Sequence, residues 1–501
     1  MRGLPLTLFV FLAPCVWAPC IWANDLPDPA APSSSLAAPT RSSPPAHATQ
    51  AESPVVPVSY RTFARTTPWS AAESAAVAAD RSDSKSSIPE PPREVGVRAV
   101  PNYEPLRDEA EEYEEEDAED EEEEEEEEVE EEGAPSTLLG DCWHQWGPIT
   151  AEYLYTGEVF NNTRGGISTK RATRYRGNVD LTLALDTAAA CWWEGGRFFT
   201  YLQQSHGQTL TEDFVGDGQF YSNIHTGDRQ DVTQLAEYWY QHSFGDDMLI
   251  VQLGRQDANE NFAFADLGGD FVNASFVTLA NVPLPTWPYQ TLGVSSLYQV
   301  NDRLRLGGGV YDHGRDHGLW WSSTVSRGMF LIGQADYQPF AGCEEALLTL
   351  VRLGAWYTNS DTLAVDEATV YEGNYGFFAT LDRMLWTEGN DAEQGLGAFC
   401  QLTWAPADRN MVDVGYGAGL VYRGLIPCRD EDTLGVGFSA IEFSSTLRDL
   451  TGQTSENVLE LFYKARVRRW LALQPDLQYI ARPSGQERDS LVAGLRFEAN
   501  F

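Results

Sequence analysis

The stretch Leu491-Val-Ala-Gly-Leu-Arg-Phe-Glu-Ala-Asn-Phe501 alternates apolar side chains with polar or small ones. Successive side chains of a β-strand point to opposite faces, so the apolar residues at positions 491, 493, 495, 497, 499 and 501 share one face. The other face carries Arg496, Glu498 and Asn500. The pattern predicts an amphipathic strand that finishes on an aromatic residue.

The same two-residue period recurs in residues 175–186, 459–467 and 471–482. In each segment Leu, Val or Tyr side chains alternate with charged side chains or amides. Phe462 breaks the pattern, because it is apolar but falls on the polar face. Many strands with one apolar face predict an all-β protein.

Two architectures bury one face of such strands: a soluble sandwich with an apolar interior, and a membrane barrel with an apolar exterior. Segments of about ten residues match the ~9 to 11 that cross a bilayer at a tilt. A terminal aromatic such as Phe501 is also common in outer-membrane barrels. Aromatic residues near the expected strand ends suit interfacial girdles: Trp192, Trp193, Trp239, Tyr240, Trp404 and Trp470.

Residues 133–501 therefore predict a transmembrane antiparallel β-barrel. Sixteen strands would each use about 23 residues, including turns, which suits short turns on one rim and longer loops on the other. Short polar turns stand at Gly245–Asp247, Asn301–Asp302 and Pro406–Asn410. The Gly-rich stretch from Gly415 to Pro427 holds one strand or two.

The part of the chain before the barrel divides into three zones. Residues 1–23 have the layout of a secretory signal peptide, cleaved after Ala23 or Ala18, with a membrane anchor as the alternative. Residues 24–103 are rich in Pro, Ser and Ala, which predicts a disordered spacer. Residues 104–132 form an acidic low-complexity run.

Charge is distributed unevenly. The 501 residues carry a net charge of −41, and residues 104–132 hold 22 acidic residues against one Arg, about half of that charge. A chain this acidic repels a phosphate backbone, so we expect no nucleic-acid partner. The acidic run predicts a solvated tether, and as a functional alternative it attracts cations or basic partners of the cell envelope.

A barrel of about sixteen strands leaves an aqueous channel, so a channel is the expected function. The polar faces of the expected strands would line it, and their mixed charges and amides suit a neutral polyhydroxylated solute. Bracing and hydrating the wall is the alternative role for each of these residues. The pore-lining residues expected from the strand pattern are Arg176, Asp180, Lys464, Arg466, Asp476, Gln478, Arg482, Arg496 and Glu498.

Several stretches between residues 146 and 501 resemble, in consistent order, the carbohydrate-selective porin family of the OprB type. The closing block, Trp470–Ile480 with Gly494–Arg496, is the most specific of them. The others are Tyr155–Gly166, Tyr175–Asp186, Leu235–Phe244, Gly254–Asp257, Ala405–Asn410 and Tyr422–Pro427.

The resemblance implies a sixteen-stranded porin of the bacterial outer membrane, surrounded by its lipid, that passes monosaccharides such as glucose down their gradient. It also implies a narrow eyelet lined by charged and aromatic residues. Five further pore-lining candidates lie in the matching blocks: Arg164, Arg171, Arg174, Asp257 and Glu260. The porin would work as a monomer or as a homotrimer.

No cofactor, metal or catalytic residue is expected. The two His residues of Asp312-His-Gly-Arg-Asp-His317 lie among glycines, which favours a loop over a metal-binding helix. His242-Ser243 is the nearest pair for a barrel lipid hydrolase, and no third partner is marked. The sequence also leaves open a non-conducting surface-binding barrel and a soluble β-rich lectin.

Five cysteines remain after signal cleavage, Cys142, Cys191, Cys343, Cys400 and Cys428, which allow up to two disulfides in an oxidising compartment. Their pairing is left open by the sequence.

Overall fold

A computed structural model describes residues 137–138, 144–226, 231–245, 247–313, 328–341, 347–388 and 394–501. The expected signal peptide, spacer and acidic run, residues 1–132, lie outside the described residues. They stay predictions.

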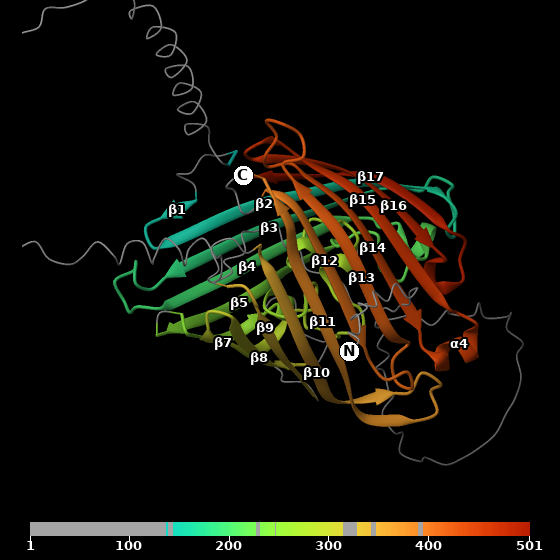
Figure 1. The fold of residues 1–501 in the computed structure, drawn as a ribbon, viewed down its shortest axis with the longest axis horizontal. Helices are drawn as coiled ribbons and strands as arrows, with labels where there is room; N and C mark the ends of the chain where they lie inside the picture. Colours follow the sequence, from blue (N-terminus) through green and yellow to red (C-terminus); the bar gives the residue numbers. More distant parts are fainter. Residues whose placement is uncertain are drawn as a thin grey trace, which may run out of the picture. The chain divides into compact units, whose positions relative to one another are not determined.

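Sixteen strands form one closed antiparallel sheet, in which each strand pairs with its neighbours in sequence and β17 pairs with β2 (Figure 1). The expected all-β barrel of sixteen strands is confirmed. A two-residue strand, β1 (Gln145–Trp146), pairs with the start of β2. The sixteen are β2 (Ile149–Arg164), β3 (Thr173–Asp186), β4 (Gly196–Gly207), β5 (Val232–Phe244), β6 (Leu249–Gln256), β7 (Thr291–Asn301), β8 (Leu304–Asp312), β9 (Met329–Tyr337), β10 (Thr349–Leu363), β11 (Val370–Thr387), β12 (Gly395–Trp404), β13 (Val412–Arg423), β14 (Thr433–Phe443), β15 (Ser455–Arg468), β16 (Leu471–Ala481) and β17 (Ser490–Asn500).

The strand expected at the end of the sequence is β17, and it closes the barrel. Leu495 pairs with Val159 of β2, and both side chains are more than 40% exposed on the outer face. The next pair, Arg496 with Glu158, is buried on the inner face. The alternation therefore separates a lipid-facing surface from a polar interior, as it does in membrane barrels.

The other expected strands are confirmed as β3, β15 and β16, and each expected turn separates two strands. The stretch that begins at Gly415 holds one strand, β13, which ends at Arg423. No helix among the described residues is long and apolar enough to cross a membrane.

Aromatic side chains group on the outer face near the strand ends. Phe198 and Tyr240 lie 4.8 Å apart between ring centroids, and the Trp193 indole N–H donates to the Tyr240 hydroxyl at 2.8 Å. On the other side of the barrel, Trp404 stacks on Phe377. These contacts fit the expected girdles.

Trp239 does not belong to this girdle, and the expectation for it is wrong. Its neighbour Tyr240 contacts the outer aromatic residues, so Trp239 points to the inner face, where it stacks on Phe199. Two consecutive residues of one strand cannot both face the lipid.

Two long connections leave the same rim of the barrel and fold into its interior. The first inner segment, residues 208–226, follows β4 and contains η2 (Thr211–Val215). The second inner segment, residues 257–290, joins β6 to β7 and contains η3 (Ala258–Glu260), η4 (Asp266–Gly268) and α3 (Ala274–Val277). Figure 1 shows them in green and yellow inside the ring of strands. A short helix, α4 (Ser445–Thr451), and η5 (Pro483–Gly485) lie in two other connections at this rim.

We predict that a positive charge on the outer face destabilises the barrel according to its depth. Leu495→Lys, in the middle of β17, should lower the free energy of unfolding by about 2–4 kcal/mol, because the ammonium must sit in hydrocarbon. Val467→Lys, next to the end of β15 and also exposed, should cost about 0–1 kcal/mol. Urea unfolding in lipid vesicles measures both. Equal costs would contradict the placement of the outer face.

Candidate functional site

Apolar side chains hold the second inner segment against the barrel wall. Phe271 packs on Phe276 of the same segment, with 4.3 Å between centroids, and edge-on against Phe462 of β15 at 4.9 Å and Phe399 of β12 at 5.5 Å. All four rings are buried. Phe462, the exception in the strand pattern, is therefore apolar because it faces this segment and not water.

Three glycines on the inner face make room for the same segment. A Cβ on Gly437 would lie 2.4 Å from a ring carbon of Phe271, and one on Gly397 would lie 2.8 Å from Leu267. A Cβ on Gly415 would lie 3.0 Å from that of Ala280. These three glycines, one each on β12, β13 and β14, allow close packing between wall and segment.

Wall carboxylates also bind the backbone of the inner segments. Glu460 of β15 accepts hydrogen bonds from the N–H groups of Val272 at 2.6 Å and Asn273 at 2.9 Å. The Gln478 amide accepts from the Asn273 side chain at 3.0 Å and donates to the carbonyl of Tyr221 in the first inner segment at 2.7 Å. One side chain of β16 therefore contacts both inner segments.

Charges at the closing seam are paired. Arg496 donates to Glu158 at 2.9 Å and to the side-chain oxygen of Asn223 at 2.7 Å, so it joins β17 and β2 to the first inner segment. Lys464 lies between Glu498 at 2.8 Å and Asp270 of the second inner segment at 3.0 Å.

Two carboxyls of the inner segments have shifted pKa values. Burial raises the pKa of Asp270, but the charge and hydrogen bond of Lys464 together with the charges of Arg466 and Arg423 outweigh it, so the pKa lies below its ordinary value. Asp217 is 3% exposed, and burial raises its pKa to about 6, although the N–H of Tyr221 donates to it at 2.6 Å. The shift of Asp217 follows from its burial, and that of Asp270 from the cations beside it.

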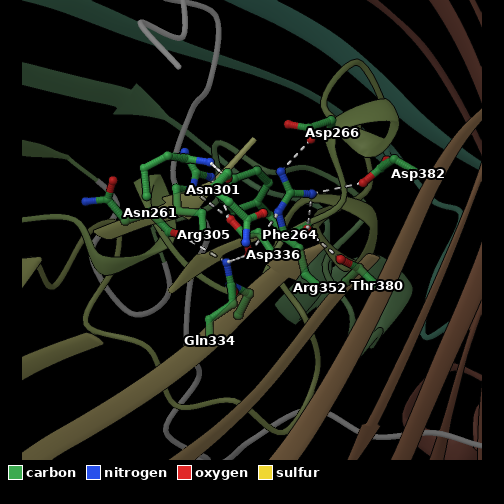
Figure 2. Close-up of polar contacts among 12 residues, drawn as sticks. Asn261, Phe264, Asp266, Asn301, Arg305, Gln334, Asp336, Arg352, Thr380 and Asp382 are labelled. Atoms are coloured by element: carbon green, nitrogen blue, oxygen red, sulfur yellow. Dashed lines mark hydrogen bonds and ion pairs between the residues drawn. The ribbon is translucent and has the colours of Figure 1, made fainter. Parts of the chain in front are cut away.

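A second charged group, which we call the Arg352 cluster, spans four neighbouring strands (Figure 2). Arg305 of β8 pairs with Asp336 of β9 at 2.6 Å. Arg352 of β10 donates to Asp382 of β11 at 3.0 Å and to Asp266 of the second inner segment at 2.5 Å.

The Arg352 guanidinium is buried and also lies 4.2 Å from the ring centroid of Phe264, which belongs to the same inner segment. Asp382 accepts a further hydrogen bond from the N–H of Leu267 at 2.9 Å. Several charge-assisted contacts thus fix the beginning of the second inner segment to one part of the wall.

Sequence reasoning missed the Arg352 cluster. The available signal was a single charge inside an otherwise apolar run, as in Leu350-Val-Arg-Leu353 and in Leu304-Arg-Leu306. Such a charge marks the inner face of a barrel strand. Which charges meet is set by the register between strands, and a pattern within one strand does not contain that information.

The expected pore-lining residues fall into distinct groups. Arg176, Lys464, Gln478 and Arg496 face inward and contact the inner segments. Asp180, Asp476 and Glu498 are buried among inner-face side chains. Asp257 begins the second inner segment and accepts from the N–H of Asn259, while Glu260 is exposed. The remaining five lie at the rims: Arg164, Arg171, Arg174 and Arg482 at the rim from which the inner segments start, and Arg466 at the opposite one.

The residues weighed for other chemistry do not assemble into a site. His242 bonds to the Tyr240 hydroxyl at 2.7 Å, and Ser243 faces the other side of the strand, so the two do not form a nucleophile and base. The described residues contain no group of three possible metal ligands. Residues 314–317 of the His-containing loop lie outside the described residues. Cys191, Cys400 and Cys428 are free thiols, whereas Cys142 and Cys343 are not described.

A closed sixteen-stranded barrel with an apolar exterior, a charged inner face and inward-folded segments defines an outer-membrane porin. The model of the OprB family of carbohydrate-selective porins matches residues 170–501. The chain belongs to this family, as its sequence resemblance predicts.

Named relatives agree with this assignment. Porin B of Pseudomonas aeruginosa is 24% identical, and the match covers 73% of this chain and 91% of that protein. The high-pH structure of Pseudomonas putida OprB is similar with a TM-score of 0.65 and 22% identity, covering 74% of this chain and 99% of that one. Its low-pH structure gives a TM-score of 0.50 and 19% identity over the same shares. The structural likeness concerns the fold.

We predict that Gly437→Ala displaces the second inner segment. The added methyl would overlap Phe271, so the free energy of unfolding should fall by about 1–3 kcal/mol. Gly333→Ala is the matched control, because its Cβ would point outward from β9 and meet nothing within 4 Å. The control should leave stability unchanged or raise it by about 0.5–1 kcal/mol. Comparable losses in the two variants would argue against the packing described here.

We also predict that Arg352→Met costs about 3–5 kcal/mol of unfolding free energy, because it leaves buried carboxylates without their cation. Single-channel current should become noisier or larger as the second inner segment loosens. Arg448→Met is the control, since the Arg448 side chain at the rim is 42% exposed and pairs with Glu442 at 3.4 Å, so the loss should be about 0–1 kcal/mol. Unaltered stability and current in Arg352→Met would show that the cluster does not hold the segment.

Proposed function

We propose that this porin passes small neutral carbohydrates of about the size of glucose by passive diffusion, in preference to charged solutes. The observation that carries the proposal is the pairing of buried charges on the inner face. Arg305, Arg352, Lys464 and Arg496 each lie against at least one carboxylate. Fixed charges paired at this distance largely cancel, so they select weakly by the sign of a solute's charge.

Hydrogen-bonding capacity supports the same solute class. Amide and hydroxyl side chains alternate with charged ones along the inner face, for example Gln334 before Asp336 on β9 and Thr380 before Asp382 on β11. Hydroxyl groups of a sugar both donate and accept hydrogen bonds, as these side chains do. The family description, a carbohydrate-selective porin, points to the same class.

The pore-lining residues are part of the proposal. Arg176, Lys464, Gln478 and Arg496 would shape the channel by holding the inner segments in place, because each is buried or mostly buried against one of them. The rim residues Arg164, Arg171, Arg174, Arg466 and Arg482 would act at the mouths of the channel.

The state of assembly, monomer or homotrimer, remains a prediction, as does attraction of cations by the acidic run.

Liposome swelling tests the proposal. Vesicles that contain the purified full-length protein should swell in isotonic glucose several times faster than in isotonic gluconate, which has a similar size but carries a charge. Protein-free vesicles, and vesicles with heat-denatured protein, are the controls. A tight bilayer would instead support a non-conducting surface-binding barrel, and equal rates for the two solutes would remove the preference for neutral sugars.

A further inference from the structure

Phe199 of β4 and Trp239 of β5 form an aromatic pair on the inner face. The pair is not part of the outer girdle, nor of the ring cluster that holds the second inner segment. The two residues are register partners, and their rings stack with 4.6 Å between centroids and 21° between planes. Both side chains are half-buried, whereas the rings that hold the second inner segment are buried. The pair therefore presents aromatic surface to the interior of the barrel.

Small residues flank the pair along the same row of the sheet. The register partner of Phe199 on β3 is Ala184, and that of Trp239 on β6 is Gly254. Stacking covers one face of each ring, and these neighbours carry a methyl group or no side chain beside the other face. The two wall positions next to the pair therefore carry no large side chain.

Polar groups border the aromatic pair on both sides. The Trp239 indole N–H donates to the Glu237 carboxylate at 3.2 Å, which fixes the ring next to an acceptor. On the other side, Arg197 and Gln241 are register partners on the same inner face. An aromatic surface between a carboxylate and hydrogen-bond donors suits a ligand that is apolar on its face and polar at its edge.

A pyranose ring has this character, because its ring face presents C–H groups and its hydroxyls point outward from the edge. We propose that Phe199 and Trp239 form a stacking subsite for the ring of a passing sugar. The subsite lies near the rim at which β4 begins and β17 ends, opposite the rim from which the inner segments start. A sugar would meet it on the far side of the inner segments. This subsite rests on the proposed passage of carbohydrates, and stacking on it would slow the passage of each sugar.

Block of the ion current by sugar tests the subsite. The purified full-length protein in planar bilayers is titrated with glucose and, separately, with sorbitol, which has similar size and hydroxyls but no ring. Trp239→Ala should raise the half-blocking glucose concentration about three- to tenfold. Trp239→Phe should stay within about twofold, and sorbitol block should not change in either variant.

Two further variants keep the test decisive. Trp239→Leu keeps a large apolar side chain but removes the aromatic ring, so glucose block should weaken as it does in Trp239→Ala. This variant tests the subsite even if Trp239→Ala fails to fold. Tyr240→Ala removes the outward neighbour on the same strand and should leave glucose block unchanged.

The outcomes separate this inference from the proposed function. A wild-type channel that neither passes glucose nor is blocked by it overturns both. A wild-type channel that passes glucose, with Trp239→Leu and Trp239→Ala blocked at the wild-type concentration, overturns the subsite alone.

Discussion

The backbone hydrogen bonds between β17 and β2 are the contact on which the rest of the structure depends. Hydrocarbon offers no partner to an open strand edge, so a sheet in the membrane must close on itself. Closure separates an outer face, which only has to be apolar, from an interior that lipid cannot reach. Inside, each strand is free to carry Arg, Asp and Glu, and Arg496 of the last strand meets Glu158 of the first across the seam.

Two kinds of contact hold the inner segments: packing between aromatic rings, and hydrogen bonds from backbone N–H groups to carboxylates of the wall. Irregular backbone has N–H groups that no strand ladder satisfies, and each needs an acceptor when buried. Acids of the wall supply it: Glu460 binds Val272 and Asn273, Asp382 binds Leu267, and Glu456 binds Gly218. These acids of the inner face therefore have a structural role, because they accept hydrogen bonds from the backbone of the inner segments.

The wall was predictable from the sequence, because its signal is local. The alternation that ends at Phe501 contains the two faces of β17, and the same pattern located β3, β15 and β16. The contents of the barrel were less predictable. Phe462 looked like an error in a pattern, and only the position of Phe271 explains it. The aromatic run Trp239-Tyr240 was assigned to one girdle, although a period of two sends its members to opposite faces.

The position of the second inner segment constrains the order in which the barrel can assemble. It lies between β6 and β7, yet Glu460, Phe462 and Gln478, which hold it, belong to strands near the other end of the sequence. Contacts between such distant residues form late, since a long loop must close first. While the C-terminal strands are still missing, Phe271 and its neighbours have no wall to cover them. An assembling chain must then shield this apolar stretch by another route, and binding by a chaperone of the cell envelope would meet that need.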